Sequence, residues 1–281
     1  MSRNIWFVTG ASSGIALELV KELLRQNYKV AATSRNKDRL IQVVGQGQND
    51  HFLPLEMTVT SEESVKAAVD AAVSHFGTID VLFNSAAHSL RGAIEETSIE
   101  EVKEIFDVNF FAVHILIKYV LPIMKKNKNG FIYNIGGIIH VVTPPLSGIY
   151  AATKSALIVY TQTLAQEVAP FGIKVVPVDP GPFETDFYSP EKLHPAKHML
   201  PEYQKMHEMR NAGAGPNRPK YPGDPERSAP IFIEIANKEE VPKMLYLGKV
   251  CIQYVTGKNK LIEAEIEKWK EYTIKADRET Q

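Results

Sequence analysis

One stretch near the start of the chain constrains its fold more than any other, IWFVTGASSGIALELVKELL at residues 5–24. A short apolar run ends at Thr9, two glycines frame the next residues, and apolar residues then recur at helical spacing. This order predicts a strand, a tight turn and an amphipathic helix, which together form the first half of a βαβ unit. The turn places backbone N–H groups at the positive end of the helix, where a phosphate can bind.

The glycine turn (residues 10–14) suits a diphosphate because Gly10 permits a tight turn and Gly14 lets a phosphate approach the backbone. Glycines in a turn are more often only a turn, but the flanking strand and helix favour nucleotide binding here. We therefore predict a diphosphate cradle made by Gly10, Ser12, Ser13, Gly14 and Ile15.

Composition excludes several classes of protein. With 281 residues the chain can form one large α/β domain, and a net charge of −1 gives no reason to expect nucleic acid. The single cysteine, Cys251, excludes a disulfide framework and fits a reducing compartment such as the cytoplasm. Residues 5–8 are too few for the apolar part of a signal peptide, and residues 110–124 are too few to span a bilayer. We expect no membrane association and no metal site.

Strand and helix signals alternate along the chain, which predicts parallel strands joined by helical crossovers. Right-handed crossovers then give a doubly wound α/β Rossmann fold, with about seven strands and a ligand cleft at their carboxyl ends. The expected strands are residues 5–9, 29–34, 51–55, 79–83, 130–135, 173–178 and 244–247, and the longer expected helices are residues 99–124, 150–168 and 259–272.

The chain reads as a single domain, residues 1–281, with three parts. Residues 1–187 form the cofactor-binding and catalytic core. Residues 188–226 are rich in proline and poor in apolar residues, so we expect a lid beside the cleft with a short helix near 202–210. Residues 227–281 supply the C-terminal helices and the last strand, and their final residues are expected to fray.

A second informative motif is Tyr150-Ala-Ala-Thr-Lys154. On a helix these two residues lie on one face, so the phenol and the ammonium point the same way. A nearby cation stabilises a phenolate and makes it useful in proton transfer near neutral pH. Such a pair alone is usually a surface feature, but this one follows a strand that ends in the predicted cleft.

Taken together, these motifs resemble those of the short-chain dehydrogenase/reductase (SDR) family, in its single-domain Rossmann branch. The resemblance runs from residue 4 to residue 187 and more loosely to the end. It rests on Thr9, Gly10 and Gly14 of the glycine motif (with Ala16 for its third glycine), Asn84-Ser85-Ala86-Ala87, Asn109, Tyr150, Lys154, Pro180-Gly181 and Thr185.

The resemblance implies an oxidoreductase that moves a hydride between a nicotinamide and a carbonyl or secondary alcohol. It implies that Tyr150 exchanges the proton, that Lys154 assists it and holds the ribose hydroxyls, and that Asn109 supports a water-linked proton path. The remaining implied cofactor contacts are Asn84 and Ala86 on the adenosine side and Pro180, Gly181, Phe183 and Thr185 at the nicotinamide.

Cofactor choice is partly readable at the end of the second strand. NAD-specific members carry an acidic residue there, whereas this chain has Ser34 followed by Arg35. A neutral residue and a guanidinium suit a 2′-phosphate, which favours NADP(H). The alternative is that Arg35 is only a solvated charge at a helix start. The family's aspartate near the adenine is replaced by Glu56, followed by Met57.

The main departure from the family is Gly137, which stands thirteen residues before Tyr150 where the catalytic serine is expected. That hydroxyl holds the substrate oxygen, and losing one preorganised donor typically costs about 10²–10³ in rate. Ser85 and Ala87 also depart from the family pattern in the same cleft.

Two interpretations follow. In the first, another donor from His140, Thr143 or Ser147 replaces the serine. In the second, the protein keeps its cofactor without redox chemistry, and it either catalyses an isomerisation or cyclisation or merely senses the cofactor. The retained Tyr150, Lys154 and Asn109 argue against a complete loss of catalysis.

The predicted substrate is a fairly large apolar molecule, because Phe183, Phe187, Tyr188 and Met199 lie in or near the lid. The helices at residues 99–124 and 150–168 are the family's usual subunit contacts, so we expect a homodimer or homotetramer. The predicted substrate-binding residues are Gly137, His140, Thr143 and Phe187.

Overall fold

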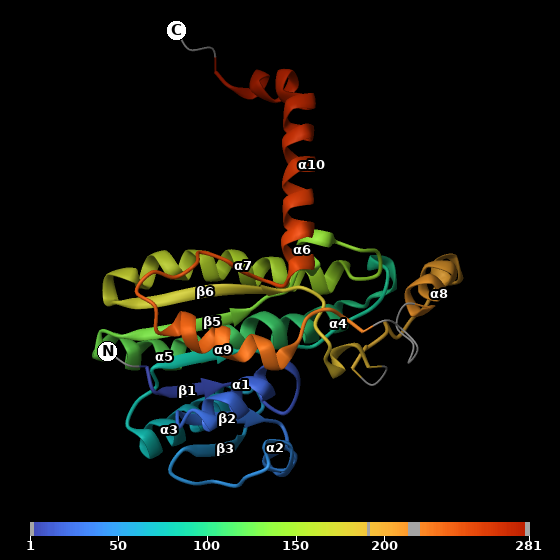
Figure 1. Cartoon of the computed structure of the whole chain (residues 1–281). Helices are drawn as coiled ribbons and strands as arrows, with labels where there is room; N and C mark the ends of the chain where they lie inside the picture. The colour runs from blue at the N-terminus through green and yellow to red at the C-terminus, as the bar shows by residue number, and fades with distance from the viewer. Residues whose placement is uncertain (1–2, 190–191, 213–219, 279–281) are drawn as a thin grey trace.

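The computed structural model describes residues 3–189, 192–212 and 220–278, and it confirms the doubly wound Rossmann fold (Figure 1). Seven parallel strands form one sheet in the order β3-β2-β1-β4-β5-β6-β7. The strands are β1 (Ile5–Val8), β2 (Lys29–Ser34), β3 (Phe52–Glu56), β4 (Val81–Asn84), β5 (Gly130–Ile135), β6 (Ile173–Pro180) and β7 (Leu245–Leu247).

Two cores cover the faces of this sheet, because successive strand residues point to opposite sides. Trp6 and Val8 of β1 join the core under α1 (Gly14–Arg25), α2 (Lys37–Val44) and α9 (Pro225–Ala236). Ile5 and Phe7 join the other core, under α3 (Glu62–Phe76), α5 (Ala112–Asn127) and α7 (Gly148–Val168). A strand buried on both faces reads as a continuous apolar run, which is what β1 shows.

The sheet positions the site through its strand order. The chain moves outward from β1 to β2 and β3 on one side, and from β4 to β7 on the other. The loops after β1 and β4 therefore diverge, and a crevice opens between them at the carboxyl ends of the strands.

The expected helix at residues 99–124 is interrupted in the middle. It begins as α4 (Ile99–Phe106), widens into a π-helical segment, η2 (Asp107–Phe111), and continues as α5 to Asn127. Pro122 lies inside α5, and the helix continues past it to Asn127. By length and composition residues 99–127 could cross a membrane, but Leu116 and Val120 are buried in the core against the sheet. Packing against the sheet therefore accounts for part of the apolar character of this helix.

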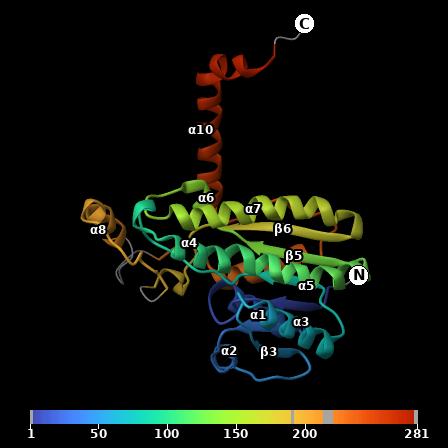
Figure 2. The same cartoon turned by 180° about the vertical axis from the view of Figure 1, so that it is seen from behind.

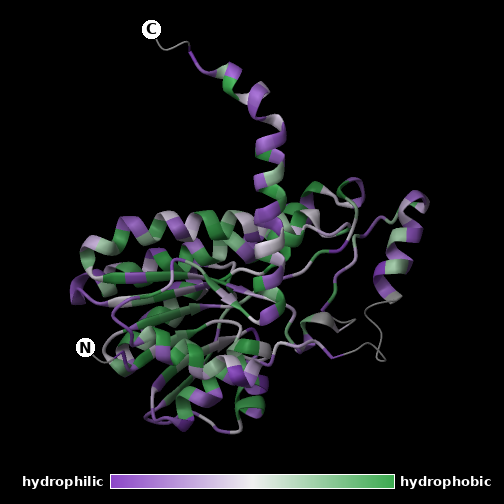
Figure 3. Cartoon of the chain, turned by 45° about the horizontal axis from the view of Figure 1, so that its top comes forward, coloured by the Kyte–Doolittle hydropathy of each residue, from purple (hydrophilic) through white to green (hydrophobic). Residues whose placement is uncertain are grey.

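The C-terminal helix begins earlier than expected. Helix α10 (Lys249–Thr273) follows Gly248 and projects from the body in both views (Figures 1 and 2). Its buried residue is Cys251, whose thiol pKa is raised to about 12 by burial, so this cysteine packs rather than reacts. Apolar side chains farther along, including Leu261 and Trp269, are exposed among charged ones (Figure 3).

Shorter elements complete the chain. The predicted short helix of the lid is present as α8 (Gln204–Ala212), after the 3₁₀ turns η4 (Asp186–Tyr188) and η5 (Pro201–Tyr203). Residues 190–191 and 213–219 of the expected lid and the last three residues of the fraying tail lie outside the described residues. Elements absent from the sequence-based prediction are η1 (Ile94–Glu96), α6 (Ile139–Val142), η3 (Ala169–Phe171) and η6 (Ile274–Ala276).

Candidate active site

The glycine turn lies backbone against backbone on the loop that follows β4. Gly10 has a φ of +67°, and a Cβ there would lie 2.9 Å from both N and Cα of Ala86. The Thr9 hydroxyl accepts hydrogen bonds from the N–H groups of Ser85 at 3.0 Å and Ala86 at 3.2 Å. Gly10 is therefore required both by the turn and by the close approach of the two loops.

The N-terminus of α1 is open to an anion. Ser13 is its N-cap residue, but the Ser13 side chain makes no capping hydrogen bond, and no acidic residue lies in the first turn. The first N–H groups of a helix have no partner within it, and they attract negative charge. A groove of about 290 Å³ passes this helix end, and its lining includes Ser12, Ser13, Gly14, Arg39, Thr185 and Asp186.

The turn after β6 reaches the same place from the other side. Gly181 N–H donates to the carbonyl of Leu247 at 3.0 Å, which ties the turn to β7. A Cβ on Gly14 would lie 3.5 Å from Cγ2 of Thr185, so these two predicted cofactor contacts are neighbours. The residues present thus form a cradle that fits the diphosphate of a dinucleotide.

Helix α7 brings Tyr150 and Lys154 together on one face, as predicted. The Lys154 ammonium lies 5.9 Å from the centre of the Tyr150 ring, and it donates to the carbonyl of Ile135 at 2.9 Å. Burial lowers the pKa of Lys154 to about 8, against the opposing effect of Asp179. The ring of Phe187 lies 5.9 Å from that of Tyr150, so Phe187 borders the phenol.

Gly137 faces the phenol. A Cβ at this position would have the Tyr150 hydroxyl oxygen as its neighbour, 4.0 Å away, with nothing closer. The φ of Gly137 is +155°, a conformation that side chains rarely adopt. Gly137 therefore leaves space beside the Tyr150 hydroxyl, and its backbone has a conformation that suits glycine.

Asp179, which the motif analysis did not select, lies directly beneath this glycine. Gly137 N–H donates to its Oδ1 at 2.9 Å, and a Cβ on Gly136 would come within 2.7 Å of the same oxygen. The Gly136-Gly137 pair thus makes room for a buried carboxylate. Burial raises the pKa of Asp179, opposed by His140, the Gly137 N–H and Lys154. An acidic residue at the end of an apolar strand, just before Pro180, was the available signal.

His140 pairs with this carboxylate. Its Nδ1 lies 2.8 Å from the carbonyl oxygen of Gly137, and its Nε2 lies 3.5 Å from Oδ2 of Asp179. A carbonyl oxygen only accepts, so Nδ1 carries a hydrogen. Both ring nitrogens therefore face protein groups, and substrate contact by His140 stays a prediction.

The other candidate donors are placed differently. Thr143 ends α6 with a φ of +45° and is exposed. The Ser147 hydroxyl accepts from the Arg210 guanidinium at 3.0 Å and is buried. That hydroxyl is therefore occupied by a side chain from α8. Substrate contact by Thr143 stays a prediction.

Asn109 lies in the π-helical segment and joins two parts of the site. Its Oδ1 accepts from His88 N–H at 2.7 Å, and its Nδ2 donates to the His88 carbonyl at 2.9 Å and to the Thr153 hydroxyl at 3.0 Å. The loop after β4 is thereby tied to α7 beside Tyr150. π-Helical segments occur often at functional sites. A role for Asn109 in proton transfer stays a prediction.

The adenosine side is formed by the ends of β2 and β3. Ser34 pairs in register with Glu56, and both Arg35 and Glu56 are exposed. The Arg35 charge is one of the causes that lower the pKa of His88, after burial and the charge of His194. The Arg35 charge is therefore near enough to His88, in the loop after β4, to influence it.

Three predicted cofactor contacts place their side chains in the interior instead. Met57 is buried in one core, and Phe183 is buried in the other against Gly223. Asn84 is buried and donates to Oδ1 of Asn134 at 2.8 Å. These residues sit at strand ends, where neighbouring side chains alternate between the cleft and the core, and spacing alone did not show which way each points.

Comparison with known proteins agrees with this geometry. Residues 4–195 match the model of the short chain dehydrogenase family. The chain belongs to that family. Oxidoreductase BOA17 of Botryotinia fuckeliana is 27% identical to this SDR over 275 residues, 96% of this chain and 98% of that protein. The 3-ketodihydrosphingosine reductase of Bacteroides thetaiotaomicron is 40% identical over 187 residues, 66% of each protein.

A solved structure shows the same likeness over nearly the whole chain. The crystal structure of a short-chain dehydrogenase from Streptomyces avermitilis superposes on this SDR with a TM-score of 0.87 and 29% identity. It covers 98% of this chain and 100% of that one. The protein is thus an SDR-type oxidoreductase, a class whose members use nicotinamide cofactors.

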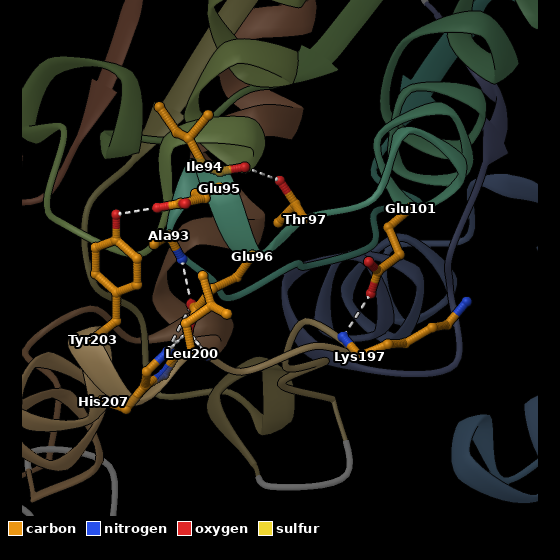
Figure 4. A network of polar contacts seen from close by, with 10 residues as sticks. All are labelled: Ala93, Ile94, Glu95, Glu96, Thr97, Glu101, Lys197, Leu200, Tyr203 and His207. Atoms are coloured by element: carbon orange, nitrogen blue, oxygen red, sulfur yellow. Dashed lines mark hydrogen bonds and ion pairs between the residues drawn. The ribbon is translucent and has the colours of Figure 1, made fainter.

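In this SDR two carboxylates hold the lid segment (residues 192–212) to the body (Figure 4). Glu96 accepts from the N–H groups of Ala93 at 2.7 Å and Leu200 at 2.8 Å, and from His207 Nε2 at 2.8 Å. Glu101 accepts from Lys197 N–H at 2.9 Å. Charge-assisted bonds to main-chain N–H groups are among the stronger ones, so they fix the path of the segment. The sequence analysis missed both residues.

The buried Lys154 of this SDR predicts a stability that depends on pH. Its folded pKa of about 8 lies below the ordinary 10.5, so between these values only the unfolded state binds the proton and stability rises with pH. Below pH 8 the buried ammonium is charged, and the full pKa shift then lowers the free energy of unfolding by about 3 kcal/mol. The Lys154→Met variant lacks the buried ammonium, so its stability should not show this rise. We therefore expect the difference in unfolding free energy between variant and wild type to shift by about 2 kcal/mol in favour of the wild type between about pH 7.5 and about pH 9.5.

Urea unfolding of the unliganded protein at the two pH values measures this difference. Lys66→Met, at an exposed lysine of α3, is the control and should show a constant difference. A constant difference for Lys154→Met would show that the buried ammonium does not titrate in this range.

Proposed function

We propose that this SDR transfers a hydride between NADP(H) and the carbonyl or secondary alcohol of a fairly large apolar molecule. The observation that carries the proposal is the Tyr150–Lys154 pair facing Gly137 at the carboxyl ends of the strands, beside the diphosphate cradle. When bound, the nicotinamide supplies or receives the hydride. Tyr150 gives a proton to the substrate oxygen in reduction and takes it back in oxidation.

The neighbours of Tyr150 support this role. A cation beside a phenol favours the phenolate, and Lys154 is the cation on the same helical face. Its ammonium donates one hydrogen bond to the carbonyl of Ile135, so its other N–H groups can donate to the ribose hydroxyls. Asn109 and Thr153 hold the backbone of this helix turn, since the Thr153 hydroxyl also donates to the Tyr150 carbonyl at 2.8 Å.

The preference for NADP(H) is supported by charge at the end of β2. Ser34 is neutral where NAD-specific members carry an acidic residue, Arg35 is exposed beside it, and Arg39 lines the groove beside the glycine turn. A guanidinium suits a 2′-phosphate, whereas a carboxylate would repel it. The non-redox alternative is not favoured, because the relatives compared above are oxidoreductases.

Replacing Arg35 with aspartate tests the cofactor preference. We expect the ratio of kcat/KM for NADPH over NADH to fall about 10- to 100-fold, the equivalent of one hydrogen bond to a charged group. Initial rates with both cofactors and one ketone measure the ratio. Lys66→Asp carries the same charge change on α3 and should leave the ratio unchanged. An unchanged ratio in Arg35→Asp would show that Arg35 is only a solvated charge.

The substrate class rests on the residues around Tyr150. Phe187 borders the phenol, and Met199, Met206 and Met209 present exposed apolar side chains on the lid segment. Phe183 no longer supports this argument because it belongs to the core, and the Tyr188 side chain lies outside the described residues. The Bacteroides relative is, by its name, a reductase of a keto compound. A series of ketones of increasing chain length, followed by NADPH absorbance, should show kcat/KM rising with length.

Assembly and location remain proposals. Phe111 and Val159 are exposed apolar residues on the helices that we expect to form subunit contacts, which supports a homodimer or homotetramer. Light scattering during size-exclusion chromatography measures the state directly. A cytoplasmic location is supported by the free, buried Cys251, which suits a reducing compartment.

A further inference from the structure

A lysine of the lid segment reaches the N-terminus of α1. The Lys192 ammonium donates to the hydroxyl of Ser13 at 2.8 Å and to Oδ2 of Asp186 at 2.6 Å. Ser13 is the N-cap residue of α1, in the glycine turn, and lies 179 residues away in the sequence. The motif analysis did not select either Lys192 or Asp186.

The main chain of Lys192 is held in place independently of its ammonium. Its N–H donates to the carbonyl of Ser189 at 3.0 Å, and its carbonyl accepts from the Ser89 hydroxyl at 2.6 Å. Ser89 is buried and belongs to the loop after β4. The side chain is therefore directed by a fixed backbone, and its position at the helix end is not the chance contact of a free surface lysine.

The helix end beside this ammonium favours an anion, against the carboxylates of Glu18, Glu184 and Asp186, which also line the groove. The first turn of α1 contains no acidic residue, and Ser13 leaves its N–H groups uncapped by a side chain. Asp186 is the carboxylate that meets Lys192, and it lines the groove. An ammonium has three donors, of which Ser13 and Asp186 accept two, so one remains for a further acceptor.

We propose that Lys192 binds a diphosphate oxygen of the dinucleotide, with the phosphate taking the place of Asp186, and that this contact couples the cofactor to the lid segment. The inference deepens the proposed function and rests on it. This contact differs from the family's glycine-turn contacts because the side chain that binds the phosphate comes from the lid segment. In the unliganded protein Asp186 pairs with Lys192, so an incoming phosphate has to compete with this carboxylate for the ammonium.

Because of this competition, replacing Lys192 and replacing Asp186 should change the NADPH dissociation constant in opposite directions. Lys192→Met removes a charge-assisted bond to phosphate, so we expect the NADPH dissociation constant to rise about 10-fold. Asp186→Asn removes the competing carboxylate, so we expect the constant to fall several-fold. Lys197→Met is the matched control, because Lys197 lies on the same segment, its side chain is exposed, and Glu101 holds it through its main-chain N–H (Figure 4).

Calorimetric titration with NADPH, and separately with inorganic pyrophosphate as a probe of the cradle, measures these constants. Both ligands should show the same order, with Asp186→Asn tightest, then wild type and Lys197→Met, then Lys192→Met. Equal constants for Lys192→Met and wild type, or weaker binding in Asp186→Asn, would overturn the inference. A wild type that binds no dinucleotide would instead overturn the proposed function.

Hydrogen exchange tests the coupling to the lid. The N–H groups of Lys197 and Leu200 report on the lid segment because Glu101 and Glu96 accept from them. NADPH should slow their exchange in wild type and in Lys197→Met but not in Lys192→Met at saturating cofactor. Equal slowing in Lys192→Met would show that the lid is ordered without this contact.

Discussion

Replacing Tyr150 with phenylalanine is expected to lower kcat about 10²- to 10⁴-fold, the usual contribution of a positioned proton donor. The change removes the hydroxyl but keeps the ring, so the contact with Phe187 should persist. NADPH should bind nearly as tightly as in the wild type, because the cradle lies at the glycine turn. Turnover of a ketone by NADPH absorbance and binding by calorimetry measure the two effects separately.

Tyr160→Phe is the matched control on the same helix. Its hydroxyl pairs with Nδ1 of His114 at 3.0 Å, outside the cleft, so turnover should be unchanged. If Tyr150→Phe kept its turnover, the proton would come from another group, and the mechanism proposed here would be wrong.

Replacing Gly137 with serine is expected to raise kcat for a ketone about 10- to 100-fold while lowering stability. The rise follows because a Cβ here has room, with the Tyr150 hydroxyl 4.0 Å away, so the new hydroxyl can hold the substrate oxygen. The loss of stability follows because a φ of +155° strains any residue with a side chain, by about 1–3 kcal/mol. Steady-state kinetics and urea unfolding measure the two effects.

Gly137→Ala separates the hydroxyl from the strain. It should lose the same stability as Gly137→Ser but gain no turnover. If the serine and alanine variants had equal kcat values, the missing hydroxyl would not limit the reaction. That result would mean that the site has been rebuilt around the glycine.

The neighbours of the two glycines show why a side chain added at Gly137 would act differently from one added at Gly136. The Gly137 N–H is bound to Asp179, and its carbonyl is bound to His140, so the peptide is held on both sides. A side chain added to Gly137 points toward Tyr150 and does not displace the carboxylate, whereas one added to Gly136 would meet Asp179 at 2.7 Å. The Gly-Gly sequence thus combines space beside the Tyr150 hydroxyl with the His140–Asp179 pair, whose carboxylate is buried.

Local patterns in the sequence determined the elements and the first contacts of the site. The apolar run, the glycines and the helical spacing of residues 5–24 define β1, the turn and α1, because these features depend on neighbours within a few residues. The Tyr150–Lys154 pair was predictable for the same reason, since one helical turn separates the two side chains. The parallel sheet followed from the alternation of elements and the handedness of crossovers.

Only the tertiary structure decided the contacts between distant parts of the chain. Lys192 meets Ser13 across 179 positions, and Gly137 meets Asp179 across 42. Such pairs depend on how strands and loops pack, which no short spacing encodes. The interior placement of Met57, Asn84 and Phe183 was decided in the same way, because a residue at a strand end can face either the cleft or the core until the neighbouring layers are in place.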